Sequence, residues 1–120
     1  MRTILTAAAL SLLLSATHPA GAHAFLDRAD PRVGSSVRAA PREVALWFTE
    51  KLEPAFSNAE VYNSAGARVD QGRARIDRSD PSVMRVSVKA LTPGTYKVRW
   101  RVLSVDTHTT EGSFSFRVGE

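Results

Sequence analysis

Apolar and polar residues alternate with a period of two along much of the chain, which is typical of half-buried β-strands. Over residues 83–89 and 95–102 every second side chain is apolar, and those between are basic or polar. Residues 43–49 carry apolar side chains on both faces, which predicts a central strand. A last strand is expected around residues 114–118, where Phe, Phe and Val alternate with polar residues.

Weaker patterns predict the shorter elements. Residues 59–63 and 67–70 read as strands on either side of a turn at 64–66, and residues 24–26 as an extended segment. Residues 50–58, 71–81 and 106–112 are expected to be loops. Within the second of these, residues 75–77 could form at most a weak strand.

About seven short strands with close turns and no helical periodicity indicate an all-β domain. We expect a Greek-key β-barrel or sandwich of the immunoglobulin-like kind. The 120 residues leave room for one domain.

The first 22 residues have the features of a secretory signal peptide. Arg2 is followed by an apolar run over residues 4–16, and Ala20-Gly21-Ala22 has the small-x-small pattern of a cleavage site. The apolar run is shorter than the ~20 residues that a spanning helix needs. We therefore expect cleavage after Ala22, a mature domain over residues 23–120, and a soluble exported protein.

Composition excludes several kinds of site. The chain has no Cys, which rules out a disulfide framework, a thiolate metal site and a cysteine nucleophile. The net charge is +4, and the basic residues Lys97, Arg99 and Arg101 fall on the expected solvent face of one strand. No aromatic residue lies between them on that face, as a single-stranded nucleic-acid platform would require, so we expect no nucleic-acid partner.

The histidines mark the candidate chemistry. His18 lies in the predicted signal peptide, which leaves His23 and His108 in the mature domain. An N-terminal His23 would offer an α-amine and an imidazole, which can chelate one metal ion. In Asp106-Thr107-His108, a carboxylate and an imidazole two residues apart would lie on one side of an extended segment. Together these groups supply three nitrogens and one oxygen, a set that suits Cu(II).

Each motif has a simpler interpretation. A histidine at a new N-terminus is often accidental, and Asp-x-His is a common surface pattern. Under that interpretation the chain is a metal-free interaction module.

The chain also resembles the CopC family of exported copper-binding, copper-resistance proteins. The resemblance covers nearly all of the expected mature domain. It rests on HAFL (23–26) followed by Asp30-Pro31, on VALWFTE (44–50), on GTYKVRWRV (94–102) and, most specifically, on SVDTHTTEGSFSF (104–116).

The resemblance implies a Greek-key β-barrel that holds one Cu(II) ion per chain. The ligands would be His23, through its amine and imidazole, with Asp106 and His108. Glu50 would act from outside the ligand set, by orienting an imidazole or a copper-bound water. The implied role is that of a monomeric periplasmic copper carrier, not an enzyme, which sequesters copper or delivers it to an inner-membrane transporter of the CopD type.

Two departures from the family pattern sharpen this expectation. Some CopC proteins carry a methionine-rich loop for Cu(I), whereas residues 61–81 contain no Met here. Met84 alternates with apolar residues and is expected in the core, so we predict a Cu(II)-only protein. Thr109 replaces a proline that many relatives have after the motif histidine, which removes no ligand.

A copper oxidase is the enzymatic alternative, because polysaccharide monooxygenases also use an N-terminal His and a second His. Asp106 argues against it, since a carboxylate in the coordination plane would occupy a position that oxygen chemistry needs.

Overall fold

A computed structural model describes residues 23–119, and the predicted signal peptide lies outside the described residues. The elements are the strands β1 (Leu26–Asp30), β2 (Ser36–Val37), β3 (Glu43–Phe48), β4 (Asn58–Tyr62), β5 (Arg75–Ile76), β6 (Val83–Ser87), β7 (Gly94–Leu103) and β8 (Thr109–Val118), with one short 3-10 helix, η1 (Pro54–Phe56). Among these residues no helix has the length and apolar character needed to span a membrane.

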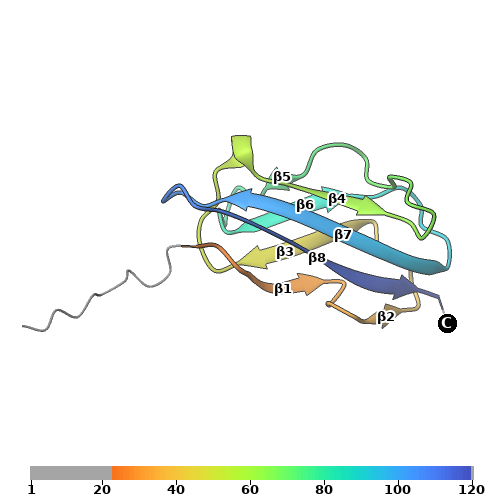
Figure 1. The fold of residues 1–120 in the computed structure, drawn as a ribbon. Coiled ribbons are helices and arrows are strands. Elements are labelled where there is room, and N and C mark those ends of the chain that lie inside the picture. Colours follow the sequence, from red (N-terminus) through yellow and green to blue (C-terminus); the bar gives the residue numbers. More distant parts are fainter. Residues whose placement is uncertain (1–22, 120) are drawn as a thin grey trace, which may run out of the picture.

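The strands form two four-stranded sheets that pack face to face (Figure 1). The first sheet has the order β1-β3-β6-β5 and the second β2-β8-β7-β4. All pairings are antiparallel except that of β2 with β8, which is parallel. The expectation of an all-β Greek-key fold is therefore confirmed, and the form it takes is a sandwich whose sheets do not close into a barrel.

The core lies between the two sheets and follows the predicted alternation. Each strand turns every second side chain inward, as its pleat requires. Met84 is fully buried, as expected from its alternation with valines. The largest fully buried side chains of this core come from both sheets: Leu46, Val44, Met84 and Val86 from the first, and Phe116, Val61, Val98 and Val102 from the second.

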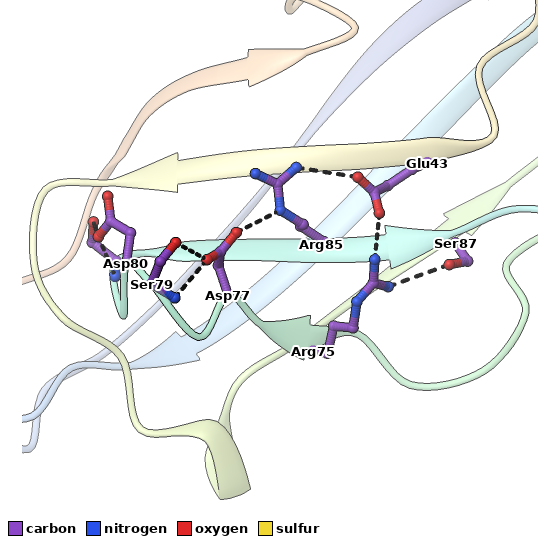
Figure 2. A network of polar contacts seen from close by, with 8 residues as sticks. Glu43, Arg75, Asp77, Ser79, Asp80, Arg85 and Ser87 are labelled. Atoms are coloured by element: carbon purple, nitrogen blue, oxygen red, sulfur yellow. Dashed lines mark hydrogen bonds and ion pairs between the residues drawn. The ribbon is translucent and has the colours of Figure 1, made fainter.

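The predicted central strand is β3, which lies between β1 and β6. Trp47 is on its outer face, where the guanidinium of Arg28 lies 3.9 Å from the ring centroid. Beside it, Arg85 donates to Asp77 (2.8 Å) and Glu43 (3.1 Å), and a bond from Arg75 to Glu43 joins β5 to β3 (Figure 2).

The largest difference from the sequence-based expectation is the start of the last strand. β8 begins at Thr109, so the loop after β7 spans only residues 104–108. Residues 109–113 are too polar to show strand alternation, yet they continue the β7 ladder in register, with Trp100 opposite Gly112 and Leu103 opposite Thr109.

The expected strand over residues 67–70 is also incomplete. Arg68 and Asp70 make only isolated bridges, to Tyr62 and Val88. The Asp70 side chain replaces part of a ladder, because its carboxylate accepts from the Val61 N–H at 2.9 Å. The two-residue strand β2 was not expected from the sequence.

The basic residues 97, 99 and 101 alternate with inward apolar residues on β7, as predicted. They line a hollow of about 650 Å³ on the outer face of the second sheet, together with Glu60 and Glu111. None of His23, Asp106 and His108 lines this hollow.

Candidate metal centre

Residues 23–25 form a short arm before β1, which we call the N-terminal arm. Its middle residue, Ala24, is fully buried in the core, whereas Phe25 is 58 % exposed. The arm lies at the end of the sandwich where β3 ends and where the β7–β8 loop turns (Figure 1). Burial of Ala24 therefore fixes where the chain reaches His23.

The β7–β8 loop carries Asp106 and His108. Its ends are tied by bonds from the Ser104 N–H to the His108 carbonyl (3.0 Å) and from the Thr107 N–H to the Ser104 carbonyl (2.8 Å). Thr107 has a φ of 73°, the left-handed conformation that non-glycine residues rarely adopt. Asp106 and His108 thus come together through a tight turn, and not through the extended segment that the sequence predicts.

The two histidines meet although 85 positions separate them in the chain. The ring centroids of His23 and His108 are 4.4 Å apart with an angle of 59° between the planes. His108 also approaches Asp106, with its Nδ1 3.4 Å from Oδ1 of that residue. His108 therefore contacts both other predicted ligands.

The surroundings of the Asp106 carboxylate favour its negatively charged form. The hydroxyl of Ser104 donates to Oδ1, and this bond, with a smaller effect from His108, holds the pKa of Asp106 below its ordinary value. Ser104 is fully buried, whereas the Asp106 side chain is 42 % exposed. The carboxylate is thus charged at neutral pH and open to solvent.

The donor set fits Cu(II) in kind, since it combines two imidazoles with a carboxylate. Within residues 23–119, however, no three His, Cys, Asp or Glu side chains are grouped so that they could hold one ion as they stand. His23 contacts His108 and His108 contacts Asp106, but the three do not converge on one point. The side chains of His108 and Asp106 are 47 % and 42 % exposed, so their rotation disturbs little packing.

Glu50, the fourth predicted residue, lies just beyond β3 and is partly buried. Its neighbour Thr49 contacts the N-terminal arm: the Thr49 hydroxyl accepts from the Phe25 N–H at 2.9 Å. In the described part of the chain the Glu50 carboxylate itself has no hydrogen bond or ion pair, so its link to the site is proximity along the chain.

Three hydroxyl residues at the site were missed by sequence reasoning: Ser104, Thr49 and Thr110. The Thr110 hydroxyl donates to the Ala24 carbonyl at 2.6 Å. All three lie inside the segments that carry the family resemblance, but the resemblance does not say what their hydroxyls bond to. The two threonines bond to residues 24 and 86 positions away in the chain, and no local sequence pattern reveals such partners.

Comparison with known proteins decides the family. A CopC domain model matches residues 26–119. The chain belongs to the CopC family. Copper resistance protein C of Pseudomonas syringae pv. tomato is 35 % identical over 122 residues, which cover 97 % of this chain and 94 % of that protein.

Two further comparisons extend the likeness to structure and to a larger protein. The crystal structure of CopC from Methylosinus trichosporium OB3b matches with a TM-score of 0.75 and 35 % identity, over 80 % of this chain and 93 % of that one. The copper transport protein CutJ of Bacillus subtilis is 33 % identical over 100 residues, which are 82 % of this chain but only 18 % of CutJ. The chain thus corresponds to a small part of that transport protein.

Proposed function

We propose that this CopC-family protein binds one Cu(II) ion at His23, Asp106 and His108, and that it carries copper for sequestration, resistance or delivery. The contact between the His23 and His108 rings, at 4.4 Å, is the observation that carries the proposal. It joins the start of the expected mature domain to the Asp-x-His loop. The names of the relatives, which refer to copper transport and copper resistance, support copper as the cargo.

The oxidation state follows from the side chains available. Cu(I) prefers thioether and thiolate ligands. The sequence has no Cys, and Met84, which is the one Met within residues 23–119, is fully buried in the core. Nitrogen and oxygen donors remain, and these favour Cu(II).

A titration with Cu(II) tests the ligand set. The chain that starts at His23 should saturate at one equivalent and give a tetragonal electron paramagnetic resonance spectrum. His23→Ala, His108→Ala and Asp106→Ala should each weaken binding by at least tenfold. Asp27→Ala is the matched control, because Asp27 is an exposed carboxylate on β1 close to the N-terminal arm. Unchanged binding by His23→Ala would refute the proposed site.

The proposal also requires export and cleavage after Ala22, because only then does His23 have a free amine. One glycine added before His23 turns this amine into a peptide nitrogen. We expect copper affinity to fall strongly in that variant and in the uncleaved precursor. N-terminal sequencing of protein from the periplasmic fraction tests both the compartment and the cleavage site.

The recipient we propose is a membrane copper transporter of the CopD type. The support is CutJ, a copper transport protein in which a segment similar to this chain makes up 18 % of the length. Copper transfer from the loaded protein to membranes with and without such a transporter tests this step. Oxidised products from a polysaccharide incubated with the loaded protein, reductant and peroxide would instead favour the oxidase alternative.

A further inference from the structure

Three backbone groups of the N-terminal arm are bonded to side-chain hydroxyls. The Ala24 carbonyl accepts from Thr110 Oγ1 at 2.6 Å, and the Phe25 N–H donates to Thr49 Oγ1 at 2.9 Å. Thr49 Oγ1 also donates to the His23 carbonyl at 3.4 Å. One backbone bond, from the Thr49 N–H to the Phe25 carbonyl at 2.9 Å, continues the pairing of β1 with β3 into the arm. The other three backbone groups are satisfied by side-chain hydroxyls instead of by the ladder.

The two threonines approach the arm from different sheets. Thr49 directly follows β3 in the first sheet, whereas Thr110 lies on β8 in the second. Thr110 is two residues after His108 on the same stretch of backbone. The bond from Thr110 to Ala24 therefore links β8, which follows His108, to the arm that begins at His23.

We propose that Thr49 and Thr110 are positioning residues for the copper site, a proposal that rests on the function proposed above. Their hydroxyls hold the backbone of residues 23–25 so that the His23 amine and imidazole stay beside His108. The buried methyl group of Ala24 anchors the arm. The Thr49 hydroxyl bonds the residues on either side of Ala24, and the Thr110 hydroxyl bonds the Ala24 carbonyl itself.

These bonds matter because the proposed ligand His23 is the first residue of the expected mature chain. A first residue that is not tied down frays, and a ligand on it must be ordered when the ion binds. A backbone that is already fixed avoids most of this entropic cost and so raises affinity without touching the ion. Neither threonine needs to be a ligand for this effect.

Valine variants separate the hydroxyl from the rest of the side chain. Thr49→Val and Thr110→Val keep the volume and the branched β-carbon but remove the donor and acceptor. Thr95→Val is the matched control: the Thr95 hydroxyl also makes one bond, from Arg117 at 3.2 Å, but it lies at the other end of β7. Thr49→Ser and Thr110→Ser keep the hydroxyl and remove only the methyl group.

Two measurements apply, one of them without metal. Amide hydrogen exchange of Phe25 in the metal-free protein should accelerate in Thr49→Val, because its acceptor is lost. Cu(II) affinity, measured by competition with a chelator, should fall by about tenfold in each valine variant, as expected for the loss of one hydrogen bond of average strength or slightly more. The serine variants and Thr95→Val should stay within about twofold of the original protein on the same scale.

The outcomes are distinguishable. If the double valine variant keeps the original copper affinity and spectrum, the positioning proposal is wrong while the ligand assignment stands. If the unaltered mature protein binds no Cu(II), the proposed function itself fails. If a valine variant does not fold, the serine variants are compared with the original protein. Loss of both Phe25 amide protection and copper affinity in the serine variants, which keep the hydroxyl, would contradict the proposal.

Discussion

Ser104 shows how a single buried hydroxyl organises the β7–β8 loop. It is fully buried, donates to the Asp106 carboxylate and lies within 3.4 Å of both the N–H and the carbonyl oxygen of His108. One small side chain thus contacts both residues of the Asp-x-His motif. A residue of this kind leaves no pattern in the sequence, because serine is common and its bonding partners are set by the turn.

Ser104→Ala should raise the pKa of Asp106 toward its ordinary value in the metal-free protein. The bond from Ser104 is the largest cause of the lowered pKa, since it stabilises the charged carboxylate. A pH titration of the Asp106 carboxyl carbon by nuclear magnetic resonance measures the change. Ser113→Ala, at an exposed position of β8, should leave it where it was. An unaltered Asp106 pKa in Ser104→Ala would contradict the role given to this hydroxyl.

At the level of elements, the pairing of β7 with β8 decides where the loop with Asp106 and His108 lies. The ladder runs from Gly94 opposite Val118 to Leu103 opposite Thr109, and residues 104–108 connect its end. Gly112 lies opposite Trp100, and a methyl group on Gly112 would come within 2.6 Å of the indole ring. Trp100 in turn packs edge-on against Phe48, with 5.1 Å between the ring centroids.

Gly112→Ala should therefore lower the free energy of unfolding by about 1–3 kcal/mol, the usual effect of overpacking. The indole must shift from its place against Phe48 and Gly112, so a change in tryptophan fluorescence should accompany the loss. Urea unfolding followed by fluorescence measures both. Ser113→Ala again serves as the control, and equal stability of Gly112→Ala would show that the ring has room to move.

The sequence predicted the elements whose apolar residues alternate and failed where polar side chains take over. The strands at 43–48 and 83–87 were predicted almost to the residue, because burial between two sheets selects their inward positions. The first half of β8 was missed, since Thr109 to Ser113 show no apolar alternation and depend on β7 for their register. Chemistry and family resemblance were enough to predict His23, Asp106 and His108 as candidate ligands. The bonds from Thr49 and Thr110 to the arm could be found only from the folded structure.

On the scale of the whole molecule, a 97-residue segment without disulfides relies on a few well-bonded polar groups in addition to its core. Asp70 is one of them, with only 6 % of its surface exposed. It accepts two bonds from Arg68, both at 2.8 Å, and one from the Val61 N–H at 2.9 Å. Burial alone would raise the pKa of Asp70, but these bonds outweigh it and the pKa is lowered.

Asp70→Asn should lower the free energy of unfolding at pH 7 by about 2–3 kcal/mol, because the charge-assisted bonds are lost. The folded pKa lies below the unfolded value of about 3.9, so this contribution is present above pH ~4 and disappears as the pH falls through the folded pKa. Urea unfolding from pH 7 to pH 2.5 should show the two proteins converging at low pH. Asp27→Asn is the control, and a constant difference at all pH values would contradict the assignment.

Copper binding should stabilise the folded protein as a whole. An ion held by His23 and His108 joins the N-terminal arm to the start of β8, and a ligand present at 100 times its Kd adds about 2.7 kcal/mol. For a domain of this size that corresponds to a rise in Tm of roughly 10 °C or more. Calorimetry with and without Cu(II) measures the rise, and at the same copper concentration a tenfold weaker His23→Ala variant should keep only about half of it or less.

The distance along the chain between His23 and the β7–β8 loop has a consequence for folding. The contacts between the N-terminal arm and Thr110 span 86 residues, so they close nearly the whole domain into one loop. Contacts of such long range form slowly, because a large loop must be closed before they contribute. A partly folded chain without β8 in place has Asp106 and His108 but nothing to hold His23 beside them. The ring contact between the histidines therefore forms only when folding is complete, and a partly folded chain does not bring the proposed copper ligands together.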